Sequence, residues 1–326
     1  MKVYVRAPYA EECLEELRNT FGEVLYEPWT KDGNRYYEDE MLEKLLEHKP
    51  EIFITELDRI TEKVLQGYKG LKVIGDCRAK PANIQVDACT RHGIPVLCTP
   101  ARNAQAVAEM LIGLVLYYYR HIGPGIQWVK DGEWTAGTTP YFTWRGHEIA
   151  GKKVGLVALG AVAQKAAALF TAFGAEVSYY DPYVDSHDLY EKKTLQEIFA
   201  TSDIVSLHLP VTEETTGLID RELLFSMKPD ALLVNTARSE VVDNEALYQL
   251  MQEKRIGGLL LDVLEKEPPE PSDLAIAALD RVVLTPHIAG ATYEVTDHQS
   301  RIMNERLLQW AKNQNLEKIV FNREVL

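Results

Sequence analysis

The first hundred residues alternate short apolar runs with longer amphipathic stretches. The short runs are rich in Val, Ile, Leu and aromatic residues, and they predict strands at 2–6, 23–27, 51–55, 71–75 and 95–99. Apolar residues recur at helical spacing among Glu, Lys and Arg in two longer stretches, which predict helices at 10–21 and 37–48. Strands that alternate with helices favour an open parallel sheet with helices on both faces.

A long apolar helix is predicted next, over 103–121. It is hydrophobic around most of its circumference, so we expect it to be buried. The segment after it, 122–146, is rich in Gly, Pro and Trp and predicts a loop of about 25 residues. A loop of that length serves an interface, packing or an active site, and the pattern leaves these alternatives open.

A second series of strands and helices begins at Gly151. Its apolar runs are nearly continuous, as expected for parallel strands buried on both faces, and predict strands at 152–159, 175–181, 203–209, 231–236, 257–263 and 281–286. Helices are predicted at 161–173, 244–253 and 296–313. The chain is therefore expected to contain two α/β sheets in series, with a hinge near residue 100.

Composition is consistent with a globular intracellular protein. The 326 residues are 46% hydrophobic and 26% charged, enough for two ordinary cores, and the net charge of −14 argues against broad contact with nucleic acid or an anionic membrane. No apolar run reaches the roughly 18 residues of a membrane span, and Arg6 interrupts any signal-like start. The four cysteines form no C-x-x-C pair, which predicts reduced thiols and a cytoplasmic location.

A phosphate-binding turn is predicted at the start of the second sheet. A strand runs into Ala158-x-Gly160-x-x-Ala163 and then into a helix, the context of a dinucleotide-binding turn. Alanine at position 158 departs from the usual glycine, so we expect a loosened or reshaped turn. Asp181 follows Gly160 by 21 residues, the spacing of the acid that binds the adenosine ribose, and its charge favours NAD over NADP. The alternatives are simple helix–strand packing and an acid that caps a strand end.

Three further strands each end in polar residues suited to reducing a 2-oxo acid. Arg238, Glu267 and His287 follow the strands at 231–236, 257–263 and 281–286. A guanidinium binds a carboxylate through two hydrogen bonds, and an imidazolium protonates the oxygen while hydride arrives at carbon. A carboxylate beside the imidazole stabilises its charged form. Each residue alone has a structural alternative, such as a loop histidine or a solvated charge. No metal site is predicted.

These motifs resemble the D-isomer-specific 2-hydroxyacid dehydrogenase family. The resemblance rests on GLVALGAVAQ, YYDPY, MKPDALLVNTARSEVVD, LDVLEKEPP and VLTPHIAG, and it extends over most of the chain. It implies two doubly wound α/β domains: a flavodoxin-like substrate domain (1–100 and 295–326) and a Rossmann NAD-binding domain (101–294). It also implies a homodimer, and it assigns substrate binding to Arg238, acid–base catalysis to His287 and pairing with that histidine to Glu267. The implied NAD contacts are Gly160, Ala161, Val162, Asp181, Leu209, Thr236, Ala237 and Asp262.

The sequence departs from the family in the loop at 76–83. Where many members carry a Gly-rich loop that holds the substrate carboxylate, this chain has Arg78, Ala79 and Lys80. We hypothesise that these residues, with Arg102, bind a second anionic group such as a phosphate or carboxylate. The alternative is that they are solvated or structural loop charges. For the whole chain, the alternatives to a dehydrogenase are an NAD(H)-sensing protein of the co-repressor type and a catalytically weakened member.

Overall fold

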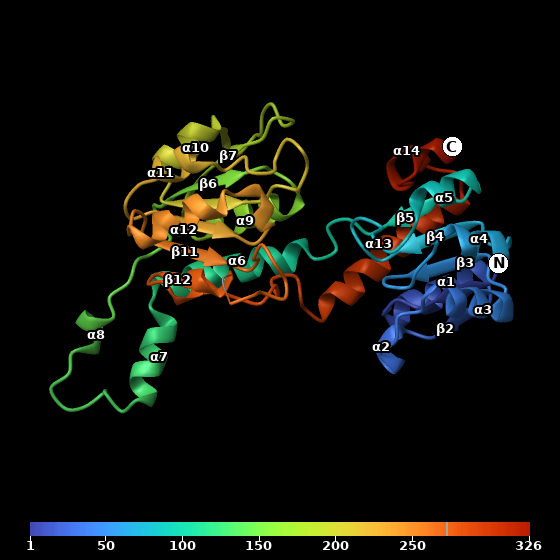
Figure 1. Cartoon of the computed structure of the whole chain (residues 1–326), viewed down its shortest axis with the longest axis horizontal. Coiled ribbons are helices and arrows are strands. Elements are labelled where there is room, and N and C mark those ends of the chain that lie inside the picture. The colour runs from blue at the N-terminus through green and yellow to red at the C-terminus, as the bar shows by residue number, and fades with distance from the viewer. Residues whose placement is uncertain (272) are drawn as a thin grey trace. The chain divides into compact units, whose positions relative to one another are not determined.

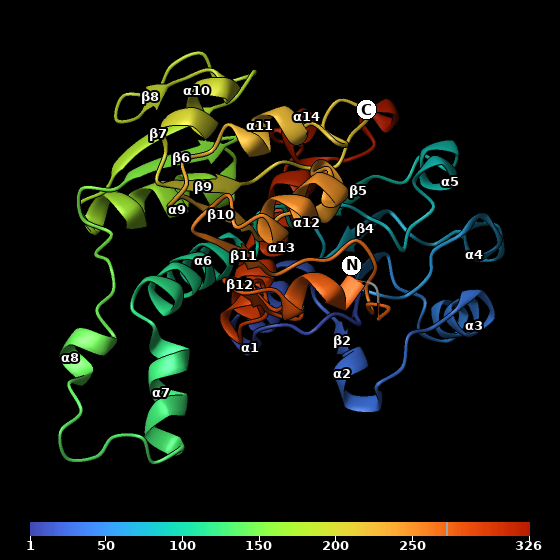
Figure 2. The same ribbon diagram turned by 60° about the vertical axis from the view of Figure 1, so that its left-hand side comes forward.

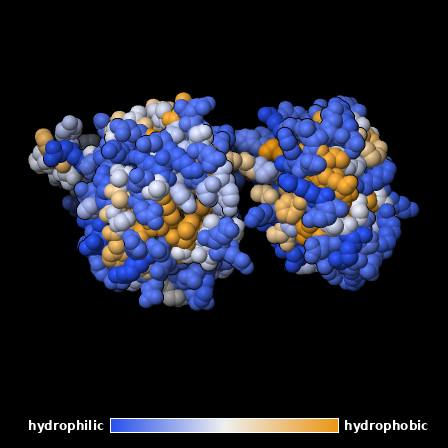
Figure 3. All heavy atoms as spheres, turned by 90° about the horizontal axis from the view of Figure 1, so that it is seen from above, coloured by the Kyte–Doolittle hydropathy of each residue, from blue (hydrophilic) through white to orange (hydrophobic). Residues whose placement is uncertain are grey.

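The chain forms two compact units in the computed structural model, which describes residues 1–271 and 273–326 (Figure 1). Unit 1 consists of Met1–Asn103 and Thr292–Leu326, and unit 2 consists of Ala104–Ala291. The domain boundaries expected from the sequence, after residue 100 and before residue 295, each lie three residues from these limits. On the face shown in Figure 3, hydrophilic residues predominate on each unit, and hydrophobic residues gather in patches.

Unit 1 contains a five-stranded parallel sheet with the order β2-β1-β3-β4-β5, which is the flavodoxin-like order. Its strands are β1 (Val3–Val5), β2 (Val24–Tyr26), β3 (Ile52–Thr55), β4 (Val73–Asp76) and β5 (Val96–Cys98). Its helices are α1 (Glu11–Phe21), α2 (Trp29–Asp32), α3 (Glu38–His48), α4 (Glu62–Gly67), α5 (Val86–Arg91), α13 (Glu294–Ala311) and α14 (Leu316–Ile319). The five predicted strands and the helices predicted at 10–21, 37–48 and 296–313 are therefore confirmed.

The alternating side chains of these strands build two cores. On one face, Val5 and Ile54 pack with residues of α1 and α13, and on the other, Tyr4 and Phe53 pack with residues of α3, α4 and α5. Successive residues of a strand point to opposite faces, so a strand that is apolar throughout can serve both layers.

Unit 2 contains a seven-stranded parallel sheet with the order β12-β11-β10-β9-β6-β7-β8. Counted from β6, this is the Rossmann order with one more strand at the β12 edge, and the strand order reverses between β6 and β9. The strands are β6 (Lys153–Val157), β7 (Glu176–Tyr180), β8 (Glu191–Lys192), β9 (Ile204–Leu207), β10 (Leu232–Asn235), β11 (Gly258–Leu261) and β12 (Val282–Leu284). The two-residue strand β8 was not predicted.

Helices cover both faces of this second sheet (Figure 1). Leu233 and Leu259 pack with α10 (Leu195–Thr201), α11 (Arg221–Phe225) and α12 (Asn244–Gln252). Leu232 and Leu260 pack with α6 (Ala104–Tyr119) and α9 (Ala161–Ala172) on the opposite face. The long apolar helix expected at 103–121 is thus α6, and it is buried against α9 within unit 2.

The segment after α6 was wrongly predicted to be a loop. It contains α7 (Ile122–Lys130) and α8 (Pro140–Thr143), neither of which has a buried residue. Pro124 is the third residue of α7, where a backbone amide has no partner within the helix and a proline costs little. Both views show α7 and α8 extending away from the sheet of unit 2 (Figures 1 and 2).

All four cysteines are free and buried. Among the described residues, no helix is both long and apolar enough to cross a membrane.

The turn between β6 and α9 keeps the shape that glycine usually provides, contrary to the expectation of a reshaped turn. Ala158 has a φ of 74°, in the left-handed region that costs an L-residue roughly 1–2 kcal/mol. The amide of Ala158 donates to the carbonyl of Tyr180 at 2.7 Å, and the amide of Leu159 donates to an Asp181 carboxylate oxygen at 2.8 Å. These two bonds hold the strained alanine in place.

We expect Ala158→Val to lower the unfolding free energy by about 2 kcal/mol, because a β-branched side chain tolerates a positive φ poorly and the site is buried. Thermal and denaturant unfolding without cofactor measure the change. Ala161→Val, at an exposed position at the start of α9, is the matched control and should change stability little. Equal losses in the two variants would contradict the strain at Ala158.

Candidate active site

The three predicted catalytic residues follow three neighbouring strands. Arg238 follows β10, Glu267 follows β11 and His287 follows β12, and these strands are adjacent in the order β12-β11-β10. Because the strands are parallel, their carboxyl ends meet at one edge of the sheet, where ligands bind in open α/β folds. The order of the strands thus explains why residues far apart in the sequence share one site.

His287 and Glu267 form a hydrogen-bonded pair. The ring nitrogen Nδ1 of His287 lies 2.5 Å from Oε2 of Glu267, and the amide of Leu264 donates to Oε1 of the same carboxylate at 3.1 Å. A carboxylate at Nδ1 favours the proton on that nitrogen and leaves Nε2 for a substrate. The two side chains also line a cavity of about 390 Å³ whose other walls include Leu264, Pro268 and Leu284.

The charge of Glu267 is stabilised by its surroundings. Partial burial raises the pKa of Glu267, but the hydrogen bonds from His287 and Leu264 and the charges of His287 and Arg238 outweigh this effect, and the net result is a lowered pKa. The carboxylate is therefore ionised at neutral pH. The effect of Arg238 on this pKa also indicates that the guanidinium lies near the pair.

Asp262 holds the loop that carries His287. Its carboxylate is 1% exposed and accepts hydrogen bonds from the Thr285 hydroxyl at 2.5 Å, the Ile288 amide at 2.9 Å and the Ala289 amide at 2.8 Å. These bonds lie on both sides of His287, whose φ of 53° is in the left-handed region. Sequence reasoning assigned Asp262 only to cofactor binding and missed this role. The sequence did carry a signal for this role, because Asp262 is an acidic residue directly after a buried strand.

Arg238 is placed by a second residue that sequence reasoning missed, Asn235 at the end of β10. The Asn235 side chain accepts from the Ala237 amide at 3.0 Å and donates to the Arg238 carbonyl at 2.9 Å. The Arg238 side chain is exposed, and its Nη1 donates to the Ala237 carbonyl at 2.7 Å. The remaining guanidinium N–H groups have no partner in the part of the chain that the structure describes, and they can bind an anion. An Asn that ends a strand three residues before an Arg predicts such a turn.

The turn at 158–163 fits a dinucleotide. A Cβ built on Gly160 would have no atom within 4 Å, so this side of the turn is open. The helix α9 begins at the next residue with no side-chain cap and no acid in its first turn, which leaves its amides and dipole for a phosphate. Ala161 is exposed and Val162 half-buried. Asp181 is 7% exposed, and besides Leu159 it accepts from the Tyr183 amide at 2.8 Å.

The other predicted cofactor residues lie at the same edge of the sheet. Thr236 follows β10, and its hydroxyl oxygen is buried without a hydrogen-bond partner among the described residues. Ala237, the next residue, is half-buried, while Leu209 follows β9 and is 5% exposed within the core. The orphaned hydroxyl of Thr236 and the open turn at Gly160 are two features that a bound dinucleotide would satisfy.

The predicted substrate residues of the 76–83 loop belong to unit 1. Arg78 is half-buried, and Ala79 and Lys80 are exposed. Neither the Arg78 nor the Lys80 side chain makes a hydrogen bond or ion pair with any described residue. Arg102 differs: its Nη1 donates to Glu56 at 2.7 Å and also to the buried side chain of Gln299. Its charge is thus already paired.

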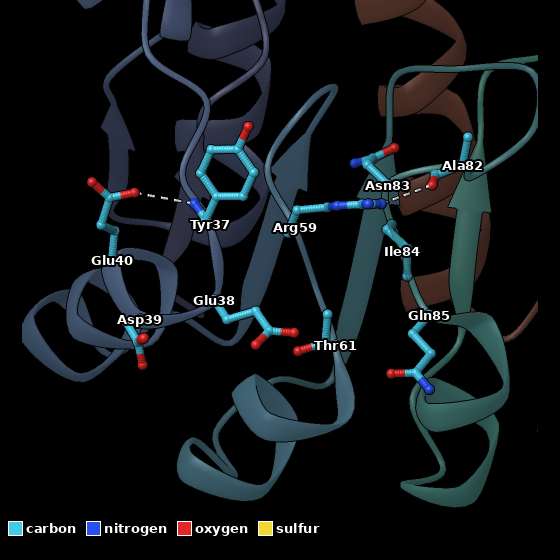
Figure 4. Close-up of a pocket in the computed structure, with 10 residues that line it drawn as sticks. All are labelled: Tyr37, Glu38, Asp39, Glu40, Arg59, Thr61, Ala82, Asn83, Ile84 and Gln85. Carbon is cyan, nitrogen blue, oxygen red and sulfur yellow. Dashed lines mark hydrogen bonds between the residues drawn. The ribbon is translucent and has the colours of Figure 1, made fainter.

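Unit 1 also has a cavity of its own (Figure 4). It has a volume of about 790 Å³, and none of the predicted site residues line it. In Figure 4 the Arg59 side chain reaches toward the carbonyl of Ala82, to which it donates at 3.3 Å, and Glu38 and Thr61 lie on another side. The walls of this cavity carry both acidic and basic side chains, which gives no reason to place the active site there.

Comparison with known proteins agrees with this geometry. Residues 112–289 match the family described as D-isomer specific 2-hydroxyacid dehydrogenase, NAD binding domain. The chain is 46% identical over 329 residues to the Bacillus subtilis protein YoaD, which is named as a 2-hydroxyacid dehydrogenase, with coverage of 100% of this chain and 96% of the relative. It is 34% identical over 333 residues to a glyoxylate reductase of Thermofilum pendens, covering 100% and 95%.

Solved structures share the fold. A Thermus thermophilus protein is 31% identical with a TM-score of 0.78, covering 98% of this chain and 100% of that one. An acyclic imino acid reductase in complex with NADPH and D-Arg is 26% identical with a TM-score of 0.78 and the same coverage. The curated relatives are named as dehydrogenases and reductases, which does not favour the sensing alternative. The chain therefore belongs to the D-isomer specific 2-hydroxyacid dehydrogenase family and is an NAD-dependent oxidoreductase.

Proposed function

We propose that this protein interconverts a 2-oxo acid and a D-2-hydroxy acid, with Arg238, Glu267 and His287 as its catalytic residues. The observation that carries the proposal is the His287–Glu267 hydrogen bond at 2.5 Å, beside a guanidinium with free donors. The relatives include proteins named as glyoxylate reductases, a hydroxypyruvate reductase and D-3-phosphoglycerate dehydrogenases. These names all describe reactions of this class.

Each residue has a distinct part in the reduction. Arg238 binds the substrate carboxylate with two N–H groups and polarises the neighbouring carbonyl. His287 donates its Nε2 proton to the carbonyl oxygen as the C2–H bond forms, and Glu267 stabilises the imidazolium before that transfer. The nicotinamide, when bound, supplies the hydride. In the reverse direction His287 takes the hydroxyl proton. Asp262 acts indirectly, by holding the His287 loop.

The residues of unit 2 around the Gly160 turn are proposed to bind NAD. The amides at Ala161 and Val162 would face the pyrophosphate, and Asp181 the adenosine ribose, where its charge disfavours a 2′-phosphate. Leu209, Thr236, Ala237 and Asp262 would complete the contacts, and the Thr236 hydroxyl would gain a partner that none of the described residues provides.

The substrate is proposed to carry a second anionic group, a phosphate or a carboxylate. Arg78 and Lys80 offer two cations that have no partner among residues 1–271 and 273–326, and Ala79 lies between them in the loop. Arg102 is omitted from this set because Glu56 and Gln299 already occupy it.

A cytoplasmic homodimer is the proposed form of the protein. The support is the exposed apolar surface of α7 and α8, which includes Ile126, Val129, Tyr141 and Phe142. Large exposed apolar areas of this kind mark interaction sites. Sedimentation velocity separates the dimer from a monomer.

The function is tested by NADH oxidation against glyoxylate, hydroxypyruvate, pyruvate and larger or phosphorylated 2-oxo acids. At least one acid should be reduced, and His287→Ala should lower kcat by about 10²- to 10⁴-fold while NADH binding persists. His147→Ala, at an exposed histidine elsewhere in unit 2, is the control and should keep its turnover. Full activity of His287→Ala would reject the assignment.

Removal of the carboxylate partner should slow the reduction. In Glu267→Gln the imidazolium loses its carboxylate, so kcat for reduction should fall while NADH binding persists. Glu265→Gln, two residues away and exposed, should keep its turnover. An unchanged kcat in Glu267→Gln would argue against the pair as the proton donor.

Arg78→Ala tests the second anionic group. We expect roughly a 10- to 100-fold loss of kcat/KM for doubly anionic acids, the loss of one charged hydrogen bond, and little change for glyoxylate. Arg18→Ala, on the surface of α1, serves as the matched control. Unchanged kcat/KM for every acid would exclude a role of Arg78 in substrate binding.

A further inference from the structure

Asp76 is a buried carboxyl group with no partner, at the edge of the sheet where the substrate loop of unit 1 begins. It is the last residue of β4 and is 0% exposed, and neither carboxyl oxygen makes a hydrogen bond with any residue among 1–271 and 273–326. The side-chain oxygens of Asn83 and Thr99, which are 5% and 0% exposed, lack partners in the same part of the chain. None of the roles proposed above uses these three side chains.

The charged groups around Asp76 come from three neighbouring strand ends. Glu56 follows β3, Arg78 follows β4 and Arg102 follows β5, and the thiols of Cys77 and Cys98 are also near. Arg102 is already paired with Glu56, so these two charges offset each other. Arg78 is therefore the unpaired cation that feels the charge of Asp76 most directly.

Burial determines the charge of this carboxyl group. Desolvation raises the pKa of Asp76 to about 8, with a smaller contribution from Glu56, and the positive charges of Arg78 and Arg102 only partly oppose it. A buried carboxylate without partners is costly, whereas the neutral acid is tolerated. At neutral pH the group is uncharged, and its negative charge develops as the pH passes 8.

We propose that Asp76 is a protonation switch for substrate affinity: its neutral form leaves the charge of Arg78 available to an anionic substrate, and its ionised form cancels that charge. Asp76 itself does not touch the substrate. It acts through Arg78, and the proposal therefore rests on the proposed function of that residue. By linkage, an anion bound at Arg78 favours the protonated form of Asp76 to the same extent.

The proton on Asp76 is tested without any substrate, by comparing the Tm of the wild type and Asp76→Asn across pH. In the native state Asp76 keeps a proton that the unfolded chain loses near the ordinary pKa of 3.8. The stability of the wild type should therefore fall as the pH rises from about 4 to about 8. Above pH 8 the carboxyl group is ionised in both states and should cause no further loss. The Tm advantage of Asp76→Asn should therefore grow over that window and then level off. Asp87→Asn, on the surface of α5, is the control and should show no such trend.

A second readout does not depend on the variant folding. Infrared difference spectra of the wild type should contain the band of a neutral carboxyl group at pH 7, and that band should disappear as the pH passes 8. A Tm difference that does not grow with pH, or a neutral-carboxyl band already absent at pH 7, would overturn the proposal.

The coupling to Arg78 is tested by repeating the Tm comparison in an Arg78→Gln background. Arg78 lowers the pKa of Asp76, so without it the levelling-off should move to higher pH. An unmoved levelling-off would show that the two groups do not interact and would contradict the switch.

The effect on affinity is tested with the 2-oxo acid that has the highest kcat/KM. The wild-type KM at pH 9 should be about tenfold its value at pH 7, while Asp76→Asn should keep the low KM at both. An equal rise in both proteins would assign the effect to another group, such as His287, and overturn the proposal. Absence of turnover with every acid would reject the proposed function, whereas the Tm comparisons would still decide the coupling of Asp76 and Arg78.

Discussion

The hydrogen bond between His287 and Glu267 is the interaction on which the proposed chemistry of this protein depends. It places a carboxylate at one ring nitrogen and leaves the other for a substrate. Neither residue lies on a regular element, and the loop of His287 is held by the buried carboxylate of Asp262. The packed ends of β11 and β12 thus provide the rigidity that the two loops lack.

A residue with a left-handed backbone, held in place by a buried carboxylate, occurs twice in unit 2. Ala158 and His287 both have left-handed backbone conformations, and in each case the amide of the following residue donates to a buried carboxylate. Leu159 donates to Asp181 at 2.8 Å, and Ile288 donates to Asp262 at 2.9 Å. Backbone strain persists where the surroundings over-determine it, and it gathers at functional sites. The sequence analysis assigned both acids to cofactor binding, and the structure shows that each of them also shapes a turn.

Much of the fold could be predicted because it depends on local patterns. Continuous apolar runs identified the strands, and the order of those strands brings Arg238, Glu267 and His287 to one edge of the sheet, as the sequence predicted. The failures have tertiary causes. Pro124 suggested a loop because its tolerated place in the first turn of α7 is not visible in composition. The pairing of Arg102 with Glu56 and the burial of Asp76 depend on which strand ends become neighbours, and no local pattern carries that information.

The most direct test of the central interaction is the ¹⁵N NMR spectrum of the His287 ring, assigned by comparison with a variant that lacks this histidine. The account predicts that the neutral ring carries its proton on Nδ1, because Nδ1 donates a hydrogen bond to the carboxylate of Glu267. A neutral ring with its proton on Nε2 and an unprotonated Nδ1 would contradict the account.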